Sequence, residues 1–101
     1  MLTSKQRAQL RGLAATEDTI VHIGKGGITD NIVTQMNDAL KARELVKGRV
    51  LENSLLTARE ACDALAETCR AEPVQVIGSK FVLYKRNEQK PKIELVKKAK
   101  K

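Results

Sequence analysis

Apolar residues recur along the chain with two spacings, one typical of helices and one typical of strands. In three segments the apolar side chains lie three and four residues apart, which predicts amphipathic helices. These segments are residues 3–15, 29–43 and 54–70. Four shorter segments, rich in β-branched and other apolar residues, predict strands. They are residues 19–23, 45–51, 74–77 and 81–84.

Polar residues and a proline mark the ends of the predicted helices. A hydroxyl at residue 3 or 4 can cap the first helix, and Gln6 stands at the spacing of a capping box from Thr3. Thr29 can cap the second helix, and the third begins near residue 54 or 57. Pro73 is expected to stop the third helix.

The connections between the strands predict how the strands pair. Helix-length segments join the first three strands, which favours parallel or mixed pairing, whereas residues 78–80 form a tight antiparallel hairpin. In the second strand Lys47 and Arg49 alternate with apolar neighbours, so one face should be basic and the other buried. Gly48 in that strand is a weak point or a bulge. We therefore expect a single compact α/β domain of order α-β-α-β-α-β-β, with helices layered against a four-stranded mixed sheet.

Positive charge is concentrated at the C-terminal end of the chain. The formal net charge is +7 over 101 residues, a length that suits one domain. Residues 85–101 carry eight basic side chains against two acidic ones, so they hold most of the excess. We assign residues 1–86 to the domain and residues 87–101 to a basic, flexible tail. Such a tail suits RNA, but peripheral binding to an anionic membrane or an acidic protein is an alternative.

Other function classes find little support in the residues present. No stretch has the continuous apolar run of a leader peptide or a membrane span, so a cytoplasmic protein is expected. Cys62 and Cys69 are seven residues apart in a predicted helix, which indicates core residues rather than a disulfide or a metal site. His22 stands alone in an apolar strand, and we interpret it as a packed residue. Neither an enzyme nor a metal-binding protein is expected.

A glycine-rich segment between the first strand and the second helix carries the clearest chemical signal. Three of residues 24–27 are glycines, which permit positive φ angles and close approach to a partner, and the fourth is Lys25. The helix that follows adds free N–H groups and the positive end of its dipole. Strand, loop, lysine and helix therefore converge on an anion the size of a phosphate, although Asp30 in the first helical turn competes for the same field.

This segment does not match the common nucleotide-binding loops. A Walker-type loop has its lysine after the glycines and a hydroxyl next to it, and the dinucleotide pattern needs a third glycine where Thr29 stands. A nucleotide-dependent enzyme would be stabilised by ATP and magnesium, which we do not expect. The G-x-x-G spacing does match the clamp by which KH domains hold the backbone of single-stranded RNA. Because Phe81 and Tyr84 are the only aromatic residues, any RNA contact must be mainly electrostatic and directed at the backbone.

Four separated blocks of sequence also resemble a known family. The chain resembles the stand-alone bacterial CRM domain (chloroplast RNA splicing and ribosome maturation), the YhbY family of RNA-binding proteins, over about residues 2–86. The blocks lie at residues 2–11, 23–29, 44–47, 76–78 and 82–86, the last two belonging to the hairpin. The resemblance implies a compact α/β domain similar to the C-terminal domain of translation initiation factor three.

The resemblance also implies a function and a set of site residues. Family members associate with precursors of the large ribosomal subunit, so we expect a non-enzymatic protein that binds ribosomal RNA and assists ribosome assembly, with no cofactor, membrane or small-molecule substrate. The expected RNA contacts in the loop are Gly24, Lys25, Gly26, Gly27, Ile28 and Thr29. Further contacts, placed by charge, are Arg7, Arg11, Lys47, Arg49 and Arg86. The role of the basic tail is left open.

Overall fold

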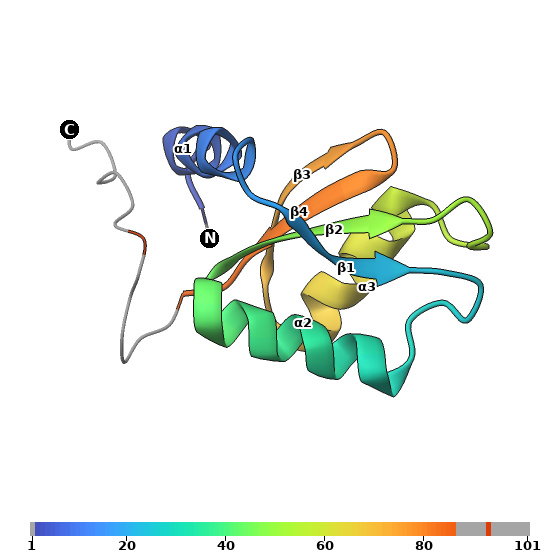
Figure 1. Ribbon diagram of the computed structural model, residues 1–101. Helices are drawn as coiled ribbons and strands as arrows, with labels where there is room; N and C mark the ends of the chain where they lie inside the picture. Colours follow the sequence, from blue (N-terminus) through green and yellow to red (C-terminus); the bar gives the residue numbers. More distant parts are fainter. Residues whose placement is uncertain (1, 87–92, 94–101) are drawn as a thin grey trace.

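Three helices and four strands alternate along the chain in a computed structural model that describes residues 2–86 and residue 93 (Figure 1). The helices are α1 (Ser4–Ala14), α2 (Asp30–Arg43) and α3 (Ala58–Cys69). The strands are β1 (Thr19–Ile23), β2 (Leu45–Val50), β3 (Glu72–Ile77) and β4 (Lys80–Tyr84). The predicted α/β class and element order are confirmed.

Each helix begins at a threonine whose hydroxyl accepts a backbone hydrogen bond. At α1 the Thr3 hydroxyl accepts the Gln6 N–H at 3.1 Å, and the Gln6 side chain accepts the Thr3 N–H at 3.0 Å. Thr57 and Glu60 form the same reciprocal capping box at α3, with distances of 3.1 and 2.9 Å. At α2 the Thr29 hydroxyl accepts the amide three residues later at 3.2 Å. These caps satisfy amides that have no partner within the first helical turn.

The four strands form one mixed sheet in the order β1-β2-β4-β3. Strands β1 and β2 are parallel, whereas β4 is antiparallel to both β2 and β3. The last two strands form the predicted hairpin, in which Ile77 pairs with Lys80 and Gly78 takes a positive φ of 58°. Strand β4 lies between β2 and β3, so the C-terminal hairpin adds two strands beside the parallel pair.

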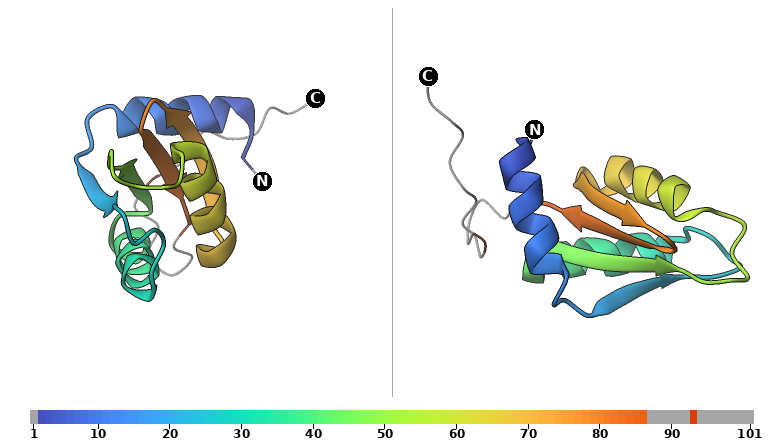
Figure 2. Two further views of the ribbon diagram at one scale, coloured as in Figure 1. Left: turned by 90° about the vertical axis from the view of Figure 1, so that its right-hand side faces the viewer. Right: turned by 90° about the horizontal axis from the view of Figure 1, so that it is seen from above.

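Helices cover the two faces of the sheet unequally. On one face α2 and α3 bury the larger apolar cluster, which includes Val21, Ile23 and Phe81. On the other face α1 packs alone, and Leu10 and Ala14 contribute to a smaller cluster. Figure 2 shows in its right-hand view that α1 crosses the strands near one end of the sheet. Among residues 2–86, no helix covers the rest of that face.

The boundary between α3 and β3 differs from the prediction. Helix α3 ends at Cys69, and its C-cap residue Arg70 takes a left-handed conformation with φ 57°. Strand β3 starts at Glu72, so Pro73 lies inside the strand and does not stop the helix. A proline is tolerated there because β3 is an edge strand, where half of the backbone N–H groups need no partner in the sheet.

Gly48 is neither a weak point nor a bulge, because its place in the sheet leaves no room for a side chain. A Cβ atom there would lie 2.7 Å from Cε2 and 3.0 Å from Cε1 of Phe81, and closer still to Cζ. The register shifts of the sheet lie instead in β1, between Thr19 and Val21, and in β3, between Pro73 and Gln75. Gly48 thus lets the fully buried Phe81 ring pack directly on the β2 backbone.

Glu44 joins α2 to β2 and is fully buried. Its φ of 64° is one that glycine adopts most easily, so the glutamate strains the backbone at this position. A carboxylate oxygen of Glu44 accepts the N–H of Ile93 at 2.7 Å, and the Ile93 side chain packs against the smaller cluster. Residues 87–92 and 94–101 lie outside the described residues, so the flexible tail stays a prediction.

Candidate nucleic-acid interface

The glycine loop, residues 24–27, leaves the carboxyl end of β1 and forms a tight turn. The Gly27 N–H donates to the Gly24 carbonyl at 3.0 Å, and Gly27 has a φ of 71° that a side chain would strain. Lys25 and Gly26 at the tip are exposed. The Ile28 side chain packs against the larger cluster, which fixes the loop to the core. The loop therefore presents a cation on a short, anchored turn.

Several amides around this tip have no protein partner. In the part of the chain that the structure describes, no hydrogen bond involves the amides of Lys25, Gly26, Ile28 or Thr29. The Gly27 amide differs, since it closes the turn. Free N–H groups at the start of a helix favour an anion. The amides of Ile28 and Thr29, which were predicted as donors, have no partner among the described residues, and the phosphate site stays a prediction.

The connection between β2 and α3 lies beside the glycine loop. The Leu51 N–H donates to the Ile23 carbonyl at 2.8 Å. A Cβ on Gly24 would lie 3.6 Å from Oδ1 of Asn53 and 3.7 Å from Cδ1 of Leu51. Leu55 in the same connection is 91% exposed. Both loops therefore emerge at the same end of the sheet, as Figure 1 also shows.

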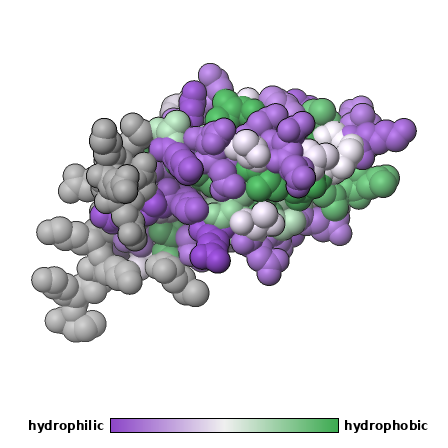
Figure 3. Space-filling view, turned by 90° about the horizontal axis from the view of Figure 1, so that it is seen from below, coloured by the Kyte–Doolittle hydropathy of each residue, from purple (hydrophilic) through white to green (hydrophobic). Residues whose placement is uncertain are grey.

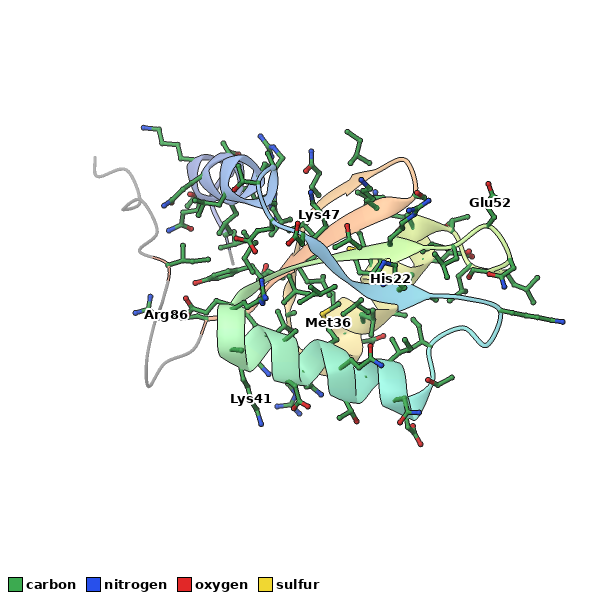
Figure 4. All side chains as sticks on the ribbon, in the orientation of Figure 1. His22, Met36, Lys41, Lys47, Glu52 and Arg86 are labelled. Carbon is green, nitrogen blue, oxygen red and sulfur yellow. The ribbon has the colours of Figure 1, made fainter. Side chains whose placement is uncertain are left out.

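We call the part of the sheet that α1 leaves uncovered the open face. It carries the basic side chains of His22, Lys47, Arg49 and Lys80. Arg49 pairs with His22 of β1 on one side and with Lys80 of β4 on the other. Directly paired residues point to the same face of a sheet, and Lys47 lies two residues from Arg49 on that face. His22 and Lys47 are labelled in Figure 4. The basic face predicted for β2 thus extends over three strands.

The interpretation of His22 as a packed residue is wrong. Val21 and Ile23 point toward α2 and α3 and are buried, so the alternation along β1 turns His22 to the opposite face. Because α1 does not reach this end of the sheet, His22 is exposed.

The remaining predicted site residues are not gathered at the glycine loop. Arg11 is exposed on α1, and Arg7 lies where α1 meets the β3 edge. The Nε atom of Arg7 is buried, and among the described residues it has no hydrogen-bond partner. The Arg7 side chain lines a shallow hollow of about 340 Å³. Arg86 follows β4 at the end where Tyr84 pairs with Leu45, about 17 Å along β2 from the glycine loop.

Charge is distributed unequally between the two sides of the sheet. Helix α1 contains three basic residues and no acidic residue, and the open face adds Lys47, Arg49 and Lys80. Helix α3 contains three acidic residues and one basic residue, Arg59, which pairs with Asp63 at 3.3 Å. Figure 3 views the molecule from below, toward α2, and shows hydrophilic residues interspersed with hydrophobic ones. The side of α1 is therefore the more positive one.

The core cysteines were predicted correctly. Cys62 and Cys69 lie on the buried side of α3, and neither forms a disulfide. Burial raises the pKa of the Cys62 thiol from 9.0 to about 11, with a smaller contribution from Asp63. Among the described residues no group of three His, Cys, Asp or Glu side chains could hold a metal ion. None of the described helices is both long and apolar enough to span a bilayer.

A known family matches residues 2–85, almost the whole described domain. The chain belongs to the CRS1/YhbY (CRM) domain family. Its relatives include a Bacillus subtilis protein named "Probable RNA-binding protein YqeI", 42% identical over 95 residues, which cover 94% of this chain and 99% of the relative. A Haemophilus influenzae "RNA-binding protein" is 33% identical over 97 residues, with 96% and 97% covered.

A solved CRM-family structure shares the fold. The solution structure of a Staphylococcus aureus protein, described as a candidate RNA-binding protein, matches with a TM-score of 0.72 and 45% identity. The match covers 95% of this chain and all of that one. The relatives are named as RNA-binding proteins, and this member of the CRM family is not an enzyme. The likeness to the C-terminal domain of translation initiation factor three stays a prediction.

Sequence reasoning missed two members of the open face, His22 and Lys80. The sequence indicates part of the position of Lys80, because the tight turn between β3 and β4 places this residue at the start of β4, opposite Ile77. Its position opposite Arg49, however, depends on β4 lying next to β2. No local feature of the hairpin specifies that neighbour.

Proposed function

We propose that this CRM-domain protein binds RNA through the glycine loop and the adjoining basic side of the sheet. Gly24, Gly26 and Gly27 let the backbone approach, and Lys25 pairs with a phosphate. The amides of Ile28 and Thr29 donate hydrogen bonds to the same phosphate. Arg49 and Lys47 contact the next part of the RNA backbone, while Arg11 and Arg7 extend the contact along α1. Of the proposed contacts, Arg86 is the least well supported, because it lies at the end of the sheet far from the glycine loop.

One observation carries this proposal. The glycine loop offers an exposed lysine and unpaired amides at the same end of the sheet as Arg49. Among the described residues no ion pair involves Lys25, Lys47 or Arg49, so these cations are available for a ligand. The names of the relatives, which are RNA-binding proteins, agree with an anionic polymer as the partner.

The proposed recognition is of the RNA backbone rather than of base identity. Phe81 and Tyr84, the only aromatic residues of the chain, are 0% and 3% exposed. No aromatic side chain is therefore available to stack on a base, as it does in many single-strand binders. Affinity supplied by phosphate contacts falls steeply as salt rises.

We further propose that the RNA is ribosomal RNA of the large-subunit precursor, and that binding assists ribosome assembly in the cytoplasm. The family resemblance supports this finer assignment. Sedimentation of cell extract through a gradient tests it, since the protein should migrate with large-subunit precursors. Migration only with free protein would contradict the assembly role while leaving RNA binding intact.

The Lys25→Ala variant tests the loop directly. Losing one phosphate contact should make the log–log dependence of affinity on salt shallower by about 0.7 for a single-stranded RNA. Lys41→Ala is the matched control, because it also removes one cation but from α2, on the opposite side of the sheet (Figure 4). Equal slopes for wild type and Lys25→Ala would remove Lys25 from the interface.

A further inference from the structure

The open face contains an arrangement of charge that costs stability and that no ion pair among the described residues compensates. Arg49 and Lys80 are direct partners on neighbouring antiparallel strands, where side chains lie about 5 Å apart at Cβ. Like charges in this position are destabilising. His22 occupies the corresponding position on the other side of Arg49. A row that violates a local rule of sheet stability is a candidate functional feature.

No acidic side chain of these strands relieves the repulsion. Strands β1, β2 and β4 contain no Asp or Glu. By sequence the nearest acidic residues are Asp18, just before β1, Glu44, just before β2, and Glu52, beyond the end of β2 and labelled in Figure 4. The Glu44 side chain is fully buried, and its carboxylate accepts the Ile93 N–H. In the described part of the chain neither Arg49 nor Lys80 has an ion-pair partner. An external polyanion therefore complements the row better than any group among the described residues does.

The spacing of the cations suits a continuous phosphate backbone. Lys47 and Arg49 are two residues apart on β2, or about 7 Å, and Arg49 is about 5 Å from Lys80 across the sheet. The cations thus extend in two directions, along β2 and across to β4. Because the surface offers charge without aromatic rings, it suits a double-stranded RNA, whose bases are already stacked on one another and whose phosphates face outward.

We propose that the open face binds the backbone of an RNA duplex while the glycine loop holds the single strand that continues from it. This inference rests on the proposed function and adds the shape of the partner: a junction between duplex and single strand. Lys80, which sequence reasoning did not select, becomes an RNA contact through its pairing with Arg49.

Two RNAs and three variants test the inference. One RNA is a single strand, and the other is the same strand extended by a duplex; each is titrated across a salt series with wild type, Lys80→Ala, Lys25→Ala and Lys41→Ala. Wild type should bind the junction RNA more tightly and with a steeper salt dependence. Lys80→Ala should make the salt slope shallower by about 0.9, the value for a duplex phosphate contact, on the junction RNA and leave the single strand unchanged. Lys25→Ala should weaken binding to both RNAs, and Lys41→Ala should change neither.

The outcomes separate this inference from the proposed function. If Lys80→Ala binds the junction RNA as wild type does, or weakens both RNAs equally, the duplex assignment is wrong while RNA binding stands. If wild type binds neither RNA, the proposed function itself fails. Thermal melting of Lys80→Ala guards against a trivial loss of fold, because removing one of two like charges should leave the melting temperature unchanged or raise it.

Discussion

Replacing Gly48 by alanine tests how tightly β2 packs on the core. The added Cβ would lie 2.7 Å from Cε2 and 3.0 Å from Cε1 of Phe81, whereas ordinary carbon contacts are about 3.5–4.0 Å. The ring would have to retreat by more than about 0.8 Å, because its Cζ atom lies closer still, yet Phe81 is fully buried in the cluster under α2 and α3. Overpacking of this kind costs about 1–3 kcal/mol.

The expected loss is large enough for a standard melting experiment. A cost of about 2 kcal/mol lowers the melting temperature of a domain of this size by roughly 8–16 °C. Gly12→Ala is the matched control, because nothing lies within 4 Å of its added Cβ in α1. That substitution should stabilise the helix by about 0.5–1 kcal/mol, since alanine has the higher helix propensity.

A double-mutant cycle identifies the ring as the cause. Phe81→Leu removes the Cε and Cζ atoms that the new Cβ would meet, so Gly48→Ala should cost less in that background than in wild type. Urea denaturation gives the four free energies of unfolding. A Gly48→Ala protein that melts at the wild-type temperature, or costs that add without coupling to Phe81→Leu, would refute the steric argument.

Three further predictions concern the loop, the buried carboxylate and a core thiol. Gly27→Ala should destabilise the protein by about 1–2 kcal/mol, because residue 27 has a positive φ. Gly26→Ala is the control and should melt near the wild-type temperature, because its added Cβ makes only an ordinary van der Waals contact. Equal melting temperatures for the two variants would contradict the prediction. Glu44→Met, which keeps the length of the side chain but removes the oxygen that accepts the Ile93 N–H, should cost about 1–3 kcal/mol in urea denaturation. An unchanged midpoint would exclude that role. Burial raises the pKa of Cys62 to about 11 in the folded state, above its ordinary value of 9.0. The stability that the protonated thiol contributes is therefore complete below pH 9 and is lost between about pH 9 and 11. Cys62→Ala should flatten this alkaline fall in the free energy of unfolding, and a variant with the same pH profile as wild type would contradict the prediction.

Much of the candidate site could be predicted because its parts are close in sequence. Residues 24–29 contain the glycines, the lysine and the helix cap within six positions, so local geometry fixes their arrangement. The alternation of Lys47 and Arg49 likewise follows from the pleat of a single strand. The position of Arg86 relative to the loop could not be predicted in this way, since charge alone does not place a residue. The pairing of Tyr84 with Leu45 puts the end of β4 far from the loop.

The sequence by itself determined the helices, the strands and most of their boundaries. Apolar spacing and hydroxyl caps act over three or four residues, so they can be read without knowing the fold. Only the tertiary structure decided the strand order, the exposure of His22, the pairing of Arg49 with Lys80 and the contact of Gly48 with Phe81. Each of these depends on which strand or helix lies beside another, and that choice is made by burying apolar surface between segments distant in sequence.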